Sequence, residues 1–169
     1  VDFALIAEII VLILLLIASA FISGSEVAYF SLTPNDLEEL QRRKGRSATT
    51  ALRLLSKPDR LLSTILVANN TVNISVIILA ALISSKLFDL SNNPVLSFII
   101  EVVVITFILL LFGEVMPKVY ASRNQLSFAL RMAPSLAFAT KLFKPLASLL
   151  SLSSFLIKRR AKTSDSNIS

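Results

Sequence analysis

Three long apolar runs constrain this chain more than any other feature of its sequence. Leu5 to Ile22 contains one charged residue, Leu61 to Leu82 contains none, and Val95 to Met116 contains two. At about 1.5 Å per helical residue, each run approaches the roughly 30 Å thickness of the hydrocarbon core of a bilayer. The sequence therefore predicts an all-α membrane protein with three spans, over about residues 4–27, 61–84 and 95–117.

The composition supports a membrane protein and excludes several kinds of chemistry. Apolar residues make up 54% and charged residues 17% of the 169 residues, against about 45–50% and 25% in soluble domains. The chain has no Cys and no His, which excludes disulfides, thiolate or imidazole metal sites, a Cys nucleophile and a Ser–His pair. We therefore expect the chain not to be an enzyme.

The basic residues are distributed unevenly around the predicted spans. Seven lie between the first two spans, Lys86 alone lies between the second and third, and nine follow Pro117. By the positive-inside rule, the N-terminus and the 83–94 connection are external, while the 33–57 loop and the C-terminal region are cytoplasmic. The acidic start of the first span also argues against a cleaved signal peptide.

The cytoplasmic loop 33–57 is predicted to contain two short helices. Thr33 is a typical N-cap, Pro34 follows in the first turn, and Gly45 ends the first helix. The second helix is expected over 48–56, before the chain turns into the membrane.

Residues 121–160 are apolar enough to suggest a fourth span, which two basic residues argue against. Lys141 and Lys144 would lie near its centre, at a cost of about 5–7 kcal/mol. We instead predict juxtamembrane amphipathic helices, broken at prolines such as Pro134, that form a basic belt on anionic lipid of the inner leaflet. Residues 161–169 are polar and are expected to be disordered.

Polar residues interrupt each predicted span in one short cluster. The clusters are Ser19, Ser23, Gly24, Ser25 and Glu26 in the first span, Asn69, Asn70 and Asn73 in the second, and Gly113, Glu114 and Pro117 in the third. Residues three or four positions apart share a helix face, so each helix presents a polar stripe. All three stripes can meet between the bilayer midplane and the cytoplasmic surface.

The third cluster points most directly to a binding site. Pro117 has no N–H, so the Gly113 carbonyl four residues earlier loses its helical partner, and a bound cation can replace that partner. An intramembrane carboxylate such as Glu114 is a functional candidate by default, although it could instead pair with Lys118. Glu101 has no polar companions and is left as a structural residue.

Alternatives remain for the other two clusters. Serines in membrane helices often bond to their own backbone or pack small interfaces, and asparagines can join helices without binding a ligand. If the clusters do form a site, its ligands are hydroxyl, amide, peptide and carboxylate oxygens, which suit Mg²⁺, Ca²⁺ or Na⁺ rather than Zn²⁺ or Cu. Glu114 is the only nearby negative charge unless Glu26 joins it, and Glu114 alone would leave a divalent ion under-neutralised and moderately held, as a carrier requires.

The motifs also resemble a known family. The succession SAFISGSEVAYFSL, DRLLSTILVANNTVNI and GEVMPKVYA is similar to the membrane domain of the CorC/cyclin M (CNNM) family of magnesium transporters, over roughly residues 15–125. The resemblance implies a homodimeric three-span domain, a juxtamembrane belt, and a Mg²⁺ site that opens to the cytoplasm, with transport coupled to Na⁺. Carried over by motif, the ligands are drawn from Ser19, Ser23, Asn70, Asn73, the Gly113 carbonyl and Glu114, with Asn69 as a near neighbour.

Two departures limit what the resemblance implies. Val27 stands where the family often has Thr, which weakens any Na⁺ role for that position. The nucleotide-binding cystathionine-β-synthase (CBS) pair expected after the belt is not among these 169 residues, so ATP regulation is not assigned to them.

We therefore predict Mg²⁺ transport across the cell membrane, as Na⁺-coupled export, with no nucleic-acid partner. The alternative is a non-transporting dimeric anchor or scaffold for a cytoplasmic regulatory domain. An intramembrane protease is a weaker third option, because the chain has no His for a Ser dyad and no Asp inside a span.

Overall fold

The computed structural model describes residues 3–87 and 94–145. These residues form helices joined by short loops, without any β-strand, which confirms the predicted all-α class. The part of the external connection at 88–93, the belt beyond residue 145 and the tail at 161–169 lie outside the described residues.

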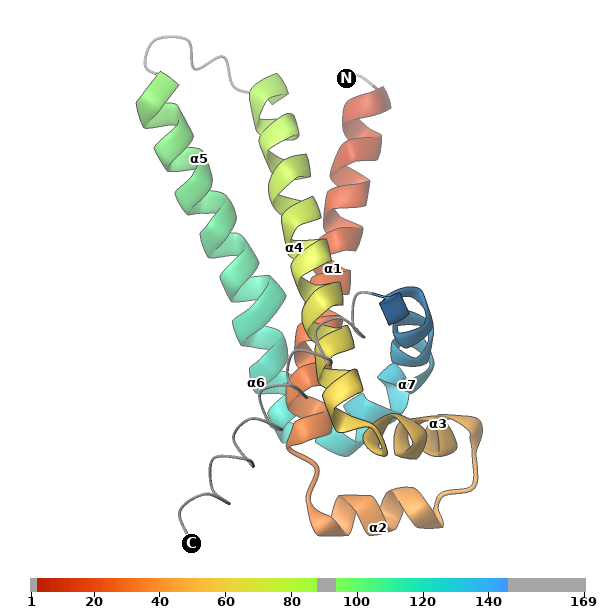
Figure 1. Ribbon diagram of the computed structural model, residues 1–169. Helices are drawn as coiled ribbons and strands as arrows, with labels where there is room; N and C mark the ends of the chain where they lie inside the picture. The colour runs from red at the N-terminus through yellow and green to blue at the C-terminus, as the bar shows by residue number, and fades with distance from the viewer. Residues whose placement is uncertain (1–2, 88–93, 146–169) are drawn as a thin grey trace, which may run out of the picture.

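Three helices are long and apolar enough to cross a membrane, as the sequence predicts. The first is α1 (Phe3–Phe30) and the second is α4 (Pro58–Leu87). The third runs continuously through α5 (Pro94–Ile108), a π-helical segment η1 (Leu109–Val115) and α6 (Met116–Arg123). Figure 1 shows the start of α1, the end of α4 and the start of α5 at one end of the molecule, and α2 and α3 at the other.

The surface of these three helices is strongly apolar. Ile10 and Leu14 on α1, Ile77 on α4, and Phe98 and Val103 on α5 are each exposed by more than a third of their area. In Figure 1, α5 also diverges from α4 toward the end that holds the N-terminus. Side chains of this kind need hydrocarbon rather than water around them, which supports a membrane location.

The helix α2 (Pro34–Arg42) begins with a capping box. The Asp36 N–H donates to Thr33 Oγ1 at 3.3 Å, and the Thr33 N–H donates to Asp36 Oδ2 at 2.8 Å. Hydrogen bonds from the Thr33 hydroxyl and from its backbone N–H hold the pKa of Asp36 below its usual range. Gln125 Nε2 donates to the same carboxylate at 3.2 Å, which ties the start of α2 to the start of α7.

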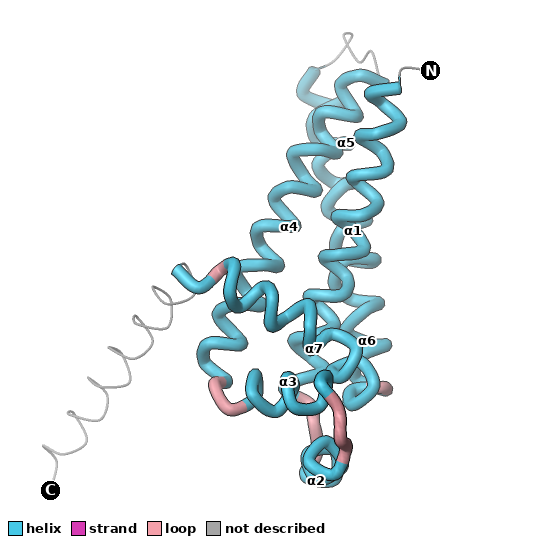
Figure 2. The backbone as a smooth tube through the Cα atoms, turned by 90° about the vertical axis from the view of Figure 1, so that its right-hand side faces the viewer, coloured by secondary structure: helices cyan, strands magenta, loops and turns pink. Residues whose placement is uncertain are grey.

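The main hydrophobic core lies at the α2/α3 end of the molecule. There α7 (Gln125–Leu142) lies across the lower parts of α1 and α4, as Figure 2 shows, and packs against both of them and against α3 (Arg46–Leu55). The largest buried side chains of this core include Tyr29, Leu40, Leu61, Ile65 and Leu136. Tyr29 Oη donates to the Ala129 carbonyl at 3.0 Å and ties α1 to α7.

The structure corrects one expectation about α7. A break is predicted at Pro134, whereas the helix continues through this residue from Gln125 to Leu142. Pro134 is exposed, while Ala133 and Leu136 beside it are buried in the core. Packing of the opposite face therefore compensates for the helical hydrogen bond that proline cannot donate.

Candidate cation site

A chain of hydrogen bonds joins polar residues of all three membrane helices. Ser19 Oγ on α1 donates to Asn73 Oδ1 on α4 at 2.6 Å. Asn73 Nδ2 in turn donates to Glu114 Oε1 on η1 at 3.0 Å. Ser19, Asn73 and Glu114, with Gly113 beside them, are called the three-helix cluster below. One residue or more from each predicted polar stripe therefore meets the others in the fold.

The three-helix cluster lies far from both ends of the membrane helices. At 1.5 Å per residue, Ser19 is about 24 Å from the first residue of α1, and Asn73 is about 22 Å from the first residue of α4. Ser19 and Gly113 are buried, whereas Asn73 and Glu114 are partly exposed. The cluster is thus at membrane depth, and its amide and carboxylate are not sealed from the surface of the chain.

Gly113 permits the close approach of α1 and η1 at this point. A Cβ atom at position 113 would lie 3.0 Å from Ser19 Oγ and 3.1 Å from Leu109 Cδ1. The first distance is tighter than ordinary van der Waals contact, so any side chain would push Ser19 or Leu109 away. Gly113 therefore contributes through the space that it leaves rather than through an unusual backbone conformation.

The π-helical register of η1 changes which carbonyls lack a donor. The Met116 N–H donates to the Leu111 carbonyl, five residues earlier. Pro117 has no N–H, so it can donate neither to the Phe112 carbonyl, five residues earlier, nor to the Gly113 carbonyl, four residues earlier. Sequence reasoning identified Gly113 alone. Short π segments inside longer helices occur frequently at functional sites.

Two further oxygens near the three-helix cluster are buried without a hydrogen-bond partner among the described residues. They are Ser23 Oγ and Asn69 Oδ1. Ser23 lies one helical turn after Ser19, and Asn69 lies one turn before Asn73, so each shares a face with a cluster residue. Buried oxygens without a protein partner generally have a water or an ion as partner, and these two could join a cation site.

Asn70 is placed differently from its neighbour Asn69. Its side chain is exposed, and no hydrogen bond within the described part of the chain joins it to the three-helix cluster. The rotation of α4 thus favours Asn69 and Asn73 over Asn70 as residues that face the other two helices.

The ion pairing of Lys118 removes one alternative for Glu114. Lys118 Nζ lies 3.1 Å from Glu26 Oε2, so Lys118 pairs with α1 and not with Glu114. Glu26 is held by this pair and is not an additional carboxylate of the three-helix cluster. Glu114 is then the carboxylate that the structure gives to the cluster.

Three other residues near the end of α1 either bond within their own helix or pack against neighbouring elements. Ser25 Oγ donates to the Phe21 carbonyl of its own helix at 2.6 Å. A Cβ at Gly24 would lie 2.6 Å from Phe128 Cζ, so Gly24 makes room for α7. Val27 packs against the main core.

Sequence reasoning missed a polar contact at the opposite end of the bundle. Lys86 Nζ on α4 forms an ion pair with Glu8 Oε1 on α1. Lys86 is the one basic residue between the second and third spans, which could have suggested this pairing with the acidic first span. Glu101 Oε1 is buried without a hydrogen-bond partner in the described residues and does not belong to the three-helix cluster.

The donor chemistry of the site is oxygen throughout. The described residues contain no group of three His, Cys, Asp or Glu side chains that could hold a metal ion. A cation bound here would rely on the Ser19 hydroxyl, the Asn73 amide, peptide carbonyls and the single carboxylate of Glu114. Such ligands suit hard cations that retain part of their water shell.

Comparison with known proteins identifies the family of this chain. The family model described as the cyclin M transmembrane N-terminal domain (CNNM) matches residues 9–168. A UPF0053 protein of Haemophilus influenzae is 35% identical over 143 residues, covering 85% of this chain and 33% of the relative. The UPF0053 inner membrane protein YfjD of Escherichia coli is 36% identical over 104 residues, covering 62% of this chain and 23% of the relative.

A third relative extends the match over most of the chain. A UPF0053 protein of Synechocystis is 29% identical over 161 residues, covering 90% of this chain and 36% of the relative. The chain thus spans about a third or less of the length of these three relatives. The family model covers nearly all of the sequence and includes every residue of the three-helix cluster. The chain therefore belongs to the cyclin M transmembrane N-terminal domain family.

Proposed function

We propose that this domain carries Mg²⁺ across the membrane through the three-helix cluster. The observation that carries the proposal is the hydrogen-bonded chain from Ser19 through Asn73 to Glu114, which joins three membrane helices at membrane depth. Polar and ionisable groups are costly there, and they usually face a pathway for an ion or a substrate.

The spacing of the oxygens supports a small, hard cation. An octahedral Mg²⁺ with ligands at about 2.1 Å places adjacent ligand oxygens about 3.0 Å apart. Ser19 Oγ and Asn73 Oδ1 are 2.6 Å apart, so a shift of a few tenths of an ångström would allow both to bind one ion. This hydrogen bond thus holds these two oxygens close to the spacing of adjacent ligands before an ion arrives.

The charge of the site supports transport rather than permanent retention. Glu114 supplies one negative charge, so a divalent ion bound there keeps a net positive charge. Water molecules complete the coordination shell, as Mg²⁺ commonly requires. Moderate binding of this kind allows the ion to leave again.

The direction of transport, the coupling ion, the oligomeric state and the regulatory domain are proposed from the family resemblance and the charge distribution. Export from the cytoplasm, across the cell membrane, is proposed with Na⁺ as coupling ion, because the same oxygens suit Na⁺. A homodimer is also proposed, and the apolar, diverging outer part of α5 offers a surface that a second copy could cover. A CBS-pair domain is proposed as the regulatory partner.

The proposal is tested by replacing Asn73 with leucine in the full-length protein. Asn73→Leu removes an amide oxygen that water cannot replace in the same position, so Mg²⁺ flux into dye-loaded vesicles should be abolished. The matched control is Thr71→Val, because the Thr71 hydroxyl donates to the Val67 carbonyl of its own helix. Flux of the control should stay within about twofold of the parent.

The same experiment separates a transporter from a non-transporting anchor. If Asn73 only joins helices, the variant loses a packing interaction of about 0.6–2 kcal/mol and melts at a lower temperature. Flux per folded molecule would then be unchanged. Full flux in Asn73→Leu, with Asn69→Leu also active, would contradict the proposed site and favour the anchor.

A further inference from the structure

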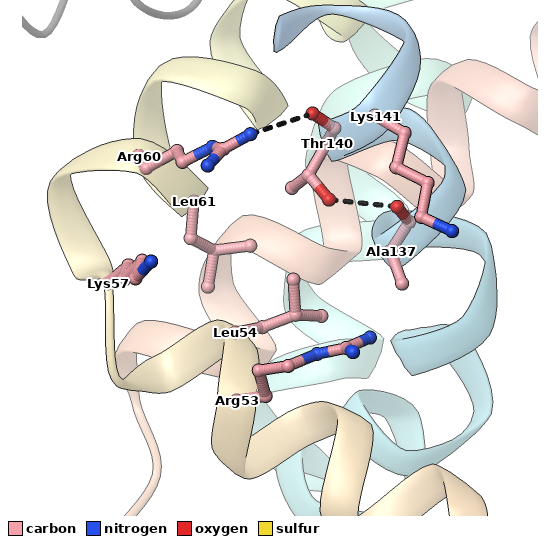
Figure 3. A pocket seen from close by; sticks show the side chains of 8 residues that line it. All are labelled: Arg53, Leu54, Lys57, Arg60, Leu61, Ala137, Thr140 and Lys141. Atoms are coloured by element: carbon pink, nitrogen blue, oxygen red, sulfur yellow. Dashed lines mark hydrogen bonds between the residues drawn. The ribbon is translucent and has the colours of Figure 1, made fainter.

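A second concentration of charge lies away from the three-helix cluster, where α3, α4 and α7 meet. A cavity of about 160 Å³ lies at this junction, and Figure 3 shows the side chains that line it. Four of its lining residues are basic: Arg53 from α3, Lys57 between α3 and α4, Arg60 from α4, and Lys141 from α7. Leu54 and Leu61, both buried, form an apolar part of its wall.

The four basic residues face no carboxylate within the described lining of the cavity. The ion pairs that the structure shows join other residues, at Glu8, Glu26, Glu38 and Glu39. Four cations around one small cavity repel one another, and an apolar wall strengthens their combined potential. An anion in the cavity would relieve that repulsion.

Arg60 is already held across the cavity. Its Nη2 donates to the Thr140 carbonyl on α7 at 3.5 Å, and Figure 3 shows the side chain reaching from α4 toward that residue. This long hydrogen bond leaves the remaining guanidinium donors available. Guanidinium groups bind phosphate oxygens through paired N–H donors, and lysine ammonium groups add charge.

The position of the cavity along α4 indicates where such an anion would come from. The 30 residues of α4 extend about 45 Å, which exceeds the roughly 30 Å hydrocarbon core. The excess length allows the first turn, which contains Arg60, to lie at the level of the lipid headgroups. By the positive-inside rule this level is on the cytoplasmic side, where anionic phospholipids attract basic segments.

We propose that the cavity between α3, α4 and α7 binds a phosphate group, supplied by an anionic phospholipid of the cytoplasmic leaflet. Arg60 contacts the phosphate from α4 and Lys141 from α7, and the acyl chains extend along the apolar surface of α4. The bound lipid joins the start of the second span to α7 and so stabilises the junction. This inference does not depend on the proposed transport function.

The proposal is tested with the purified full-length protein in detergent micelles. Phosphatidylglycerol should raise the melting temperature and remain bound in native mass spectra, whereas phosphatidylcholine, whose choline offsets the phosphate charge, should do so far less. The pocket variant Arg60→Gln/Lys141→Gln should lose about tenfold or more in apparent affinity for phosphatidylglycerol. The control Arg42→Gln/Arg123→Gln removes the same charge outside the cavity and should bind like the parent.

A second pocket variant tests the cavity independently of the first, and inorganic phosphate tests whether the ligand is a lipid or a soluble anion. Arg53→Gln/Lys57→Gln changes two exposed side chains, so it tests the cavity even if the first variant unfolds. Protection by inorganic phosphate alone, lost in the pocket variants and without preference for phosphatidylglycerol, would support the phosphate site but assign it a soluble ligand. Equal phosphatidylglycerol binding by the pocket and control variants would overturn the proposal.

Discussion

At the scale of single residues, Glu114 and Gly113 have different tasks in the three-helix cluster. Glu114 accepts a hydrogen bond from Asn73 at 3.0 Å and brings the negative charge. Gly113 has no side chain and leaves the space that Ser19 Oγ occupies. Charge and space can be altered separately, because the two residues are adjacent but act through different atoms.

The charge is tested by Glu114→Gln, which keeps the size of the side chain and removes its negative charge. We expect the affinity for Mg²⁺, measured by calorimetry, to fall about tenfold or more, which corresponds to about 1.4 kcal/mol. Glu101→Gln is the matched control, since it neutralises a carboxyl of the same span outside the cluster. Unchanged Mg²⁺ affinity in a well-folded Glu114→Gln protein would contradict the assignment.

The space is tested by Gly113→Ala. Its new methyl group would lie 3.0 Å from Ser19 Oγ, so α1 and η1 must separate or the serine must rotate. We expect a loss of stability of about 1–3 kcal/mol, typical of an overpacked contact, together with weaker Mg²⁺ binding. Gly45→Ala is the control, because nothing lies within 4 Å of a Cβ at that position. Equal melting temperatures and Mg²⁺ affinities for the two variants would show that Gly113 is not needed for space.

At the scale of the helical element, η1 is a wider, π-helical segment of seven residues, and Pro117 lies shortly after its end. The Met116 N–H donates five residues back, and Pro117 cannot donate at all. One peptide carbonyl beside Glu114, that of Phe112 or of Gly113, therefore loses the N–H that residue 117 would otherwise donate. Pro117 therefore lowers the stability of the helix, and the proposed site would use the carbonyl that it leaves without a donor.

Pro117→Ala should separate stability from function. Alanine supplies the missing N–H and is the better helix former, so the melting temperature should rise or stay the same. The restored pairing removes a free carbonyl, so Mg²⁺ affinity should decrease. Pro134→Ala, in α7 and away from the cluster, should raise stability without changing Mg²⁺ affinity. A Pro117→Ala protein that binds Mg²⁺ as tightly as the parent would show that η1 is only a structural irregularity.

At the scale of the whole molecule, packing is concentrated at one end. The main core joins α1, α2, α3, α4, α6 and α7 at the end that carries most of the basic residues. The opposite end is held by fewer described contacts, including the ion pair of Glu8 with Lys86. Packing concentrated at one end suits the proposed transport, in which the helices would have to separate to pass an ion.

The proposed orientation is tested by single cysteines, because the chain has none of its own. Ser47 on α3, Ser135 on α7 and Ala4 on α1 are exposed and can each be changed to Cys. In sealed vesicles, a membrane-impermeant maleimide should label positions 47 and 135 from the cytoplasmic side and position 4 from the external side. Labelling of position 135 from the external side alone would show that α7 has crossed the membrane.

The sequence by itself determined the three spans, the polar stripes and the helix-capping signals. These features depend on local properties: hydropathy over about 20 residues, the absent N–H of proline, and the hydroxyl of Thr33 at a helix start. They can therefore be predicted before any contact between helices is known.

Only the tertiary structure decided how the stripes meet. Each residue turns a helix by about 100°, so the rotation of α4 determines that Asn73 and Asn69, rather than Asn70, face the other helices. In the same way, the packing of α1 against α6 pairs Lys118 with Glu26 and leaves Glu114 to Asn73. The continuation of α7 through Pro134 likewise depends on the core that covers its opposite face. Such outcomes follow from contacts between residues distant in the chain, which local patterns do not encode.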